Sequence, residues 1–168
     1  MAQVICDVSL LRRFLLMLRK GAPSVKIGVI GDKATAQRKT AGGHIQLTNA
    51  LLAFVHEFGR KSAPKIPARS FIRMPLELHL EELLSKKKAL TQAAMERAIR
   101  AGRGEEFSRK IGIVAEECIQ TAFRTRGYGD WKPNAPSTIK AKGSDAPLID
   151  TGELRRSITS EVVKEGKC

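Results

Sequence analysis

EEFSRKIGIVAEECIQTAFRTR, residues 105–126, has the most regular hydrophobic spacing in this chain of 168 residues. Apolar side chains recur every three or four positions, at Phe107, Ile111, Val114, Cys118 and Ala122, joined by Ile119 and Phe123. This spacing places them on one face of a helix, where they can be buried together. The segment therefore predicts a long amphipathic helix, with Cys118 as a small core residue rather than a reactive thiol.

A second long helix is predicted before this one, from Pro75 to about Arg100. Proline suits the first turn of a helix, and the leucines that follow keep helical spacing, at Leu76, Leu80, Leu83 and Leu84. Gly102 and Gly104 then break the pattern. Two helices joined by a short turn favour an antiparallel pair, which we expect on one face of a sheet.

The strands of that sheet are predicted near both ends of the chain. Ser24–Ile30 alternates apolar and other residues, and Ser157–Val163 is rich in β-branched residues. His44–Leu47 is a candidate for a further short strand. Together the elements predict a single α+β domain over residues 1–168, with a small, mainly antiparallel sheet packed by the long helix pair and by an N-terminal helix at residues 7–20.

Three further segments connect these elements. Residues 31–43 contain no sizeable apolar residue, which is typical of a long exposed, flexible loop or hairpin. Thr48 or Asn49 is predicted to cap a helix that ends at Phe58, before Gly59, with its buried row at Leu51, Phe54, Val55 and Phe58. Asp150 or Thr151 is predicted to cap a very short helix before the last strand.

The charge balance and the cysteine positions restrict the setting. Lys and Arg total 30 against 17 Asp and Glu, a formal net charge of +13. This excess repels like subunits unless it faces DNA, acidic partners or solvent. Cys6, Cys118 and Cys168 share no metal-type spacing, which favours a reduced intracellular setting. No apolar stretch approaches the roughly 20 residues that cross a bilayer, so membrane insertion and secretion are disfavoured.

The sequence offers no motif for bond-breaking chemistry. His56-Glu57 would begin a zinc-protease motif, but position 60 is Arg rather than the required second His. No phosphate-binding glycine loop is present either. We therefore expect a protein that is not an enzyme and has no metal or cofactor, although a carboxylate pair of Glu57 and Asp150 stays open. His56 and Glu57 are predicted to be polar partners that fix the loop after them.

Two segments carry a resemblance to a known family. One, within residues 127–157, contains Trp-x-Pro at 131–133, Ser-Thr-Ile-x-x-Lys-Gly at 137–143 and Pro-Leu-Ile-Asp-Thr-Gly-Glu-Leu-Arg-Arg-Ser from 147. The other contains His-Glu-Phe-Gly at 56–59, a basic loop, and Ile-Pro-Ala-Arg-Ser-Phe-Ile-Arg at 66–73. Together they resemble the tail-completion or virion-morphogenesis proteins of tailed bacteriophages, although Ser70 stands where that family more often has Pro.

The resemblance implies a function and partners. Members of that family are small α+β subunits without catalytic residues, and they form rings, commonly of six, where the tail joins the head. It implies a virion neck protein that assembles in the bacterial cytoplasm around the DNA path. Its partners would be copies of itself, tail-tube or tail-terminator proteins, and head connector or stopper proteins. The alternatives are a tail-terminator ring protein and, from another class, a basic nucleic-acid-binding protein.

The candidate contact residues come from the loop and from the two segments. In the loop they are Lys33, Arg38 and Lys39. In the segments they are His56, Glu57, Arg69, Phe71, Tyr128, Trp131, Leu148, Asp150, Thr151, Leu154 and Arg155. For Trp131, an interface anchor and a plug of the local core remain equally open.

Overall fold

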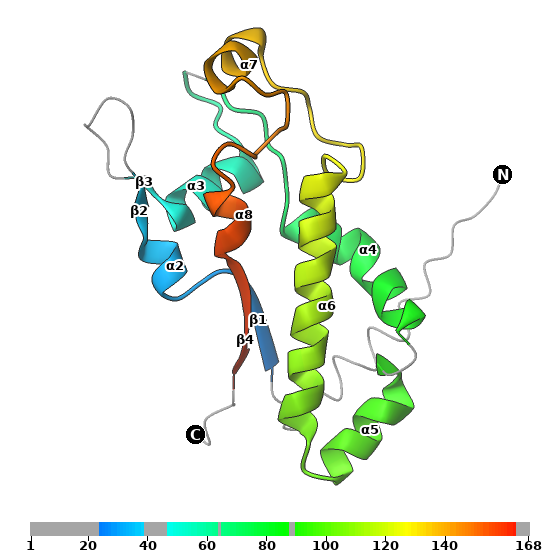
Figure 1. Ribbon diagram of the computed structural model, residues 1–168. Coiled ribbons are helices and arrows are strands. Elements are labelled where there is room, and N and C mark those ends of the chain that lie inside the picture. Colours follow the sequence, from blue (N-terminus) through cyan, green and yellow to red (C-terminus); the bar gives the residue numbers. More distant parts are fainter. Residues whose placement is uncertain (1–23, 39–46, 64, 88–89, 164–168) are drawn as a thin grey trace, which may run out of the picture.

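The computed structural model of the protein describes residues 24–38, 47–63, 65–87 and 90–163. In chain order the elements are β1 (Ser24–Val29), α2 (Asp32–Thr35), β2 (Gln37–Arg38), β3 (Leu47–Thr48), α3 (Asn49–Phe58), α4 (Arg73–Lys86), α5 (Gln92–Arg100), α6 (Gly104–Arg124), α7 (Pro136–Lys142), α8 (Glu153–Ser157) and β4 (Ile158–Val163). This is the predicted α+β fold, arranged around the long helix α6 (Figure 1). The predicted helix at residues 7–20 lies outside the described residues.

The central sheet pairs the two predicted terminal strands. β1 and β4 are antiparallel, from Ser24 opposite Val163 to Val29 opposite Ile158. Their β-branched residues suit a pleated surface that is covered on one side. Both strand predictions are therefore confirmed, and strands from the two ends of the described chain meet in one ribbon.

The long helix α6 covers this ribbon, with the predicted apolar row turned inward. Phe107, Ile111, Val114, Cys118 and Ala122 are buried, as are Ile119 and Phe123. The helix lies so close to β4 that a Cβ added at Gly112 would stand 2.5 Å from the Ser160 hydroxyl. The Glu116 carboxylate accepts hydrogen bonds of 2.6 Å from the Ser160 amide and hydroxyl. Packing and polar contacts thus both fix helix to strand.

The predicted helix from Pro75 to Arg100 is two helices. α4 ends at Lys86, and Thr91 begins α5 because its hydroxyl accepts a hydrogen bond of 3.2 Å from the Ala94 amide. A hydroxyl in this position caps a new helix rather than continuing the old one. The chain descends through α4 and α5 and returns along α6 (Figure 1). Met95 of α5 packs with Phe107 and Ile111 at the lower end of α6.

The predicted loop at residues 31–43 is partly ordered structure. Its described part forms α2 and the strand β2, which pairs with β3 through Gln37 opposite Thr48 and Arg38 opposite Leu47. The Asn49 side chain donates to the Lys33 carbonyl at 2.9 Å, so α2 is held against the start of α3. Local hydrogen bonds hold residues 31–38, and the antiparallel pairing of β2 with β3 agrees with the hairpin alternative of the prediction. Of the strand predicted at His44–Leu47, only Leu47 lies within the described residues.

Helix α3 has the predicted ends but not the predicted buried face. Thr48 caps it, with its hydroxyl accepting a 3.2 Å hydrogen bond from the Leu51 amide, and Gly59 ends it. The inward face carries Asn49, Ala53 and Glu57. Leu51, Phe54 and Phe58 are exposed, so their predicted burial is wrong, because the buried polar residues have partners that hold the opposite face inward. Val55, the fourth residue of the predicted row, is half-buried.

Two smaller differences occur in the C-terminal part of the chain. Helix α7 was not predicted, although Pro136 opens it and Gly143, with φ of 67°, ends it. Helix α8 begins at Glu153 after Gly152, rather than at a cap from Asp150 or Thr151. The Thr151 hydroxyl still accepts from the Glu153 amide at 3.4 Å.

Candidate functional site

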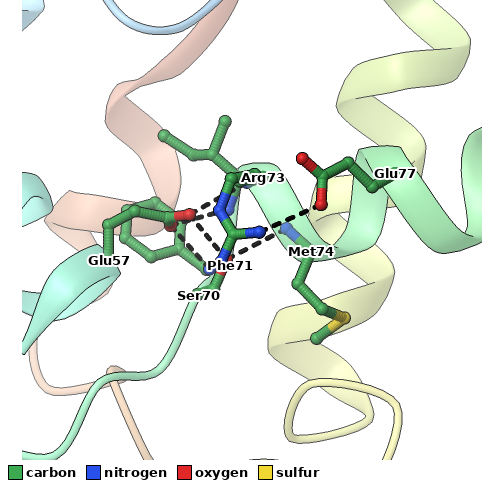
Figure 2. A network of polar contacts seen from close by, with 7 residues as sticks. Glu57, Ser70, Phe71, Arg73, Met74 and Glu77 are labelled. Atoms are coloured by element: carbon green, nitrogen blue, oxygen red, sulfur yellow. Dashed lines mark hydrogen bonds and ion pairs between the residues drawn. The ribbon is translucent and has the colours of Figure 1, made fainter.

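A buried carboxylate joins α3 to the first turn of α4. Glu57 accepts four hydrogen bonds: from the Ser70 hydroxyl (2.6 Å), and from the amides of Phe71 (2.8 Å), Ile72 (3.0 Å) and Arg73 (3.0 Å). Figure 2 shows these donors converging on one side chain. The first amides of a helix have no partner within it and carry partial positive charge. Glu57 therefore caps α4 from a different helix.

Ser70 completes this cap. Its hydroxyl accepts a hydrogen bond of 2.9 Å from the Met74 amide while it donates to Glu57 (Figure 2). Position 70 is where the resembled family more often has Pro. A serine here keeps an amide and a hydroxyl, so the turn is closed by side-chain hydrogen bonds rather than by a proline ring.

A buried arginine joins the same turn to the segment after α6. The Arg69 guanidinium donates to the carbonyls of Lys132 and Pro133, both at 2.9 Å, across 63 and 64 residues of chain. The Arg69 amide donates to the His56 carbonyl at 2.8 Å. Burial lowers the pKa of Arg69 from its ordinary value. Its fork of donors satisfies two backbone carbonyls at once, which a lysine cannot do with the same geometry.

Trp131 fixes this junction from the core side. Its indole donates to the Ser70 carbonyl at 3.1 Å, and its ring meets Phe123 edge-on with centroids 5.7 Å apart. The ring of Phe71 also meets Phe123 edge-on, with centroids 5.3 Å apart. A Cβ at Gly127 would stand 2.2 Å from the indole, so only glycine fits beside Trp131. Trp131 is buried in the core cluster, which corresponds to the second of its two predicted roles, that of filling the local core.

Tyr128 and Cys118 join α4 to α6. The Tyr128 hydroxyl donates to the Cys118 carbonyl at 3.1 Å, and its ring stacks on His79 with centroids 3.6 Å apart. The Cys118 thiol donates to the Pro75 carbonyl at 3.2 Å. Burial, followed by the hydrogen bond with Cys118, raises the pKa of Tyr128, and burial also raises the pKa of the Cys118 thiol. Both groups are therefore neutral, structural side chains at ordinary pH.

The rest of the C-terminal segment is closed by backbone-directed contacts. The Asn134 amide donates to the carbonyls of Asp145 and Ala146, both at 3.2 Å, which closes the loop that contains α7. The Arg155 guanidinium donates to the Gln120 side chain at 2.6 Å, and the Gln120 amide donates back to the Arg155 carbonyl at 3.0 Å. These contacts fasten α8 to α6. Sequence reasoning missed Asn134 and Gln120, since neither belongs to a pattern that spacing can reveal.

The structure thus places five predicted contact residues inside the subunit. Their side chains are buried: Glu57, Arg69, Phe71, Trp131 and Leu154. In the structure each of them is buried against its own chain, and their contact with a neighbouring subunit stays a prediction. Their role is to build the junction between the two resembling segments. The prediction that Glu57 fixes the loop after it is confirmed.

Seven of the other predicted contact residues lie at or near the surface. His56, Tyr128, Leu148 and Arg155 are half-buried, whereas Lys33, Asp150 and Thr151 are exposed. Arg38 lies in β2, and Lys39 is outside the described residues. Of the carboxylates that were considered as a pair, Glu57 accepts hydrogen bonds from the α4 turn, and Asp150 is exposed.

The part of the chain that the structure describes contains no group of three or more His, Cys, Asp or Glu side chains placed to hold a metal ion. None of the described helices is both long enough and apolar enough to span a bilayer. Comparison of the chain with protein-family models, with curated proteins and with solved structures gives no significant match. The geometry defines an α+β fold in which two segments far apart in the sequence, those of Arg69 and Trp131, are joined by hydrogen bonds.

Proposed function

We propose that this protein is a structural subunit of the neck of a tailed bacteriophage. It completes the head-proximal end of the tail or joins the tail to the head connector, as one member of a ring around the DNA path. The observation that supports this proposal is the junction between the two segments that resemble the family. Arg69 of one segment donates to Lys132 and Pro133 of the other, and Trp131 donates back to Ser70.

This junction supports the proposal because the two segments that carry the resemblance lie far apart in the sequence. Two chance similarities at distant places in a sequence are not expected to form one hydrogen-bonded unit in the fold. Two segments inherited together from one fold are expected to do so. The local geometry of the two segments also requires particular residue types, at Glu57, Gly59 and Gly127. A Cβ at Gly59, for example, would stand 2.8 Å from the Ala68 amide nitrogen.

The junction leaves the surface elements free to make the assembly contacts. Its hydrogen bonds join Arg69, after the loop that follows α3, to Lys132 and Pro133, before α7, and α7 lies at one end of the molecule (Figure 1). Closed rings need two different and complementary surfaces on each subunit, so that every copy contacts the next one in the same way. In this proposal the partners are copies of the chain, the tail tube or its terminator, and the head connector or stopper.

One observation favours the second candidate, a basic nucleic-acid-binding protein. Residues 60–69 and 132–142 are joined through Arg69 and contain no Asp or Glu. Their exposed cations include Arg60, Lys61, Lys65, Lys132 and Lys140. A surface of this kind binds phosphates with a steep dependence on salt concentration. The same surface fits a ring that encloses DNA or an acidic partner ring.

The test is the position of the protein in assembled particles. Gold-labelled antibody against the chain should mark the neck of virions, and particles made without the chain should accumulate as separate heads and tails. A salt-titrated DNA shift assay on the purified protein distinguishes the rival. Absence of the chain from finished particles, combined with tight and salt-sensitive DNA binding by a monomer, would reject the neck assignment.

A further inference from the structure

Helix α3 presents a stripe of large apolar side chains to solvent. The exposed fractions of Leu51, Phe54 and Phe58 are 47%, 61% and 61%, and the two phenylalanine rings lie 5.0 Å apart. We call these three residues the α3 stripe. Exposed apolar area costs about 25 cal/mol per Å² compared with buried area, so clustered aromatic residues on a surface mark a contact site.

The α3 stripe has a basic border. Between Phe58 and Leu76 the chain contains no Asp or Glu, and the loop that leaves α3 carries the exposed cations Arg60, Lys61 and Lys65. The only carboxylate within α3 is Glu57, which is buried and bound to the α4 turn. A surface that fits the α3 stripe must therefore be apolar with an acidic border.

The chain itself carries such a surface on α4. Leu78 is 64% exposed there, and the exposed carboxylates of Glu81 and Glu82 follow it three and four residues later on the same face, with Glu77 next to it in the sequence. We call these four residues the α4 outer face. Two of these carboxylates also form exposed ion pairs within α4, Glu77 with Arg73 and Glu82 with Lys86. The other side of α4 packs on α6, so the outer face points away from the subunit. Its character is the complement of the α3 stripe.

The two surfaces lie on different flanks of the subunit. α3 packs on α8 and β1, whereas α4 packs on α6, and Figure 1 draws them on opposite sides of α6. Two complementary surfaces on different flanks of one chain produce a head-to-tail contact between copies. A two-fold contact would instead need each surface to complement itself.

We infer that the α3 stripe binds the α4 outer face of a second copy of this chain, with Lys61 and its neighbours facing Glu77, Glu81 and Glu82. The inference rests on the proposed function in that it supplies the subunit contact of the ring. It assigns this contact to α3, whose end carries Phe58 of one resembling segment, and to α4. Phe54 and Phe58 enter the contact as aromatic anchors, and the charges set its direction.

The first experiment measures the assembly state of the full chain by sedimentation velocity. Replacing Phe54 and Phe58 together by Ser should weaken self-association by a hundredfold or more, on the order of what two aromatic anchors contribute. The circular dichroism and the melting temperature should stay unchanged, because both side chains are exposed. Ile113→Ser, at an exposed apolar position of α6, is the matched control and should leave association unchanged.

The second experiment tests the pairing of charges. Lys61→Glu and Glu81→Lys should each weaken association by about tenfold, and the double variant should recover it. Lys26→Glu combined with Glu81→Lys is the control, since Lys26 is exposed on β1 and not on α3 or the loop after it, and it should not recover association. A loss that arose only from local destabilisation would not be recovered by a second charge reversal.

The third experiment identifies the occupant of the stripe. In a background with Cys6 and Cys168 replaced by Ser, an equimolar mixture of Phe58→Cys and Leu78→Cys chains should form a mixed disulfide dimer on mild oxidation. Phe58→Cys homodimers would instead indicate a two-fold contact. A separate chain that carries both Phe58→Cys and Leu11→Cys tests the other occupant, because an intrachain disulfide in it would indicate that the N-terminal segment covers the stripe. Either result overturns the inference, as does wild-type protein that stays monomeric. A ring that persists in the phenylalanine variant overturns this contact alone, whereas absence of the chain from virions overturns only the proposed function.

Discussion

The Glu57 carboxylate and the Phe71 amide lie 2.8 Å apart in the interior, and through this bond α3 holds the start of α4. Four donors share this one side chain, so its removal leaves buried amides without partners. Helix caps are usually local, coming from the residue just before the helix. Here the cap comes from 14 residues earlier in the chain, which makes the orientation of the two helices depend on one residue.

Glu57→Ala should therefore destabilise the subunit strongly. We expect the free energy of unfolding to fall by about 3 kcal/mol, because several buried amides lose a charged acceptor. Urea denaturation followed by circular dichroism measures it. Glu81→Ala, at an exposed position of α4, is the control and should change the free energy by less than about 0.5 kcal/mol. Equal effects of the two substitutions would show that the cap is unimportant.

The contact between Gly127 and Trp131 gives a second prediction. Gly127→Ala places a methyl group into the indole and also puts Ala at φ of 70°. Gly129→Ala suffers only the backbone strain, since nothing lies within 4 Å of its Cβ position. We expect the Gly127 variant to lose about 2 kcal/mol more than the Gly129 variant. The fluorescence of the single tryptophan should shift to the red in the first variant only.

Arg69→Lys should weaken the junction between the two resembling segments. Lysine keeps the positive charge but cannot donate in a planar fork to the Lys132 and Pro133 carbonyls. The expected loss is about 2 kcal/mol in the free energy of unfolding, with faster amide exchange around residues 131–134. Arg60→Lys, at an exposed position, should do neither. If amide exchange in this segment stayed slow in the Arg69 variant, the junction would not depend on the guanidinium.

The raised pKa of Tyr128 predicts a particular alkaline response. Burial and the hydrogen bond with Cys118 raise its folded pKa above the ordinary value, so the folded state retains the proton more tightly than the unfolded state. The resulting stability is fully present below the unfolded pKa of about 10 and is lost as pH rises through the folded pKa. Because this is the only tyrosine in the chain, its ultraviolet titration is directly assignable.

That titration should stay incomplete above pH 10 in the folded protein and become normal in urea. Tyr128→Phe should flatten the fall in stability that begins at about pH 10. An ordinary titration curve in the folded state would contradict the buried position next to Cys118.

The sequence predicted the parts of the fold where apolar periodicity and burial agree. α6 exposes its polar side and buries Phe107, Ile111 and Phe123, so its spacing was sufficient. β1 and β4 were found from alternation and β-branched content for the same reason. The C-terminal short helix and the ends of α3 were found from their turn residues, within the accuracy with which helix ends are defined.

Predictions from the sequence were wrong where hydrogen bonds, and not hydrophobicity, determine which side chains are buried. α3 buries Asn49 and Glu57 because each has backbone partners from another element, and the more apolar side is left outside. Such partners are 13 to 16 residues away, beyond the reach of helical spacing. The break between α4 and α5 depends on one threonine hydroxyl. Because α3 buries its polar face, its apolar face is exposed, and this is the surface that we assign to the subunit contact.

We propose that this chain functions by binding to copies of itself and to neighbouring rings. Negative-stain electron microscopy of the purified full chain, at concentrations up to those of an assembling virion, is the decisive measurement. We expect closed rings of one size for the wild-type protein and single subunits for the double Phe54 and Phe58 serine variant. Single subunits in both samples at every concentration would contradict it.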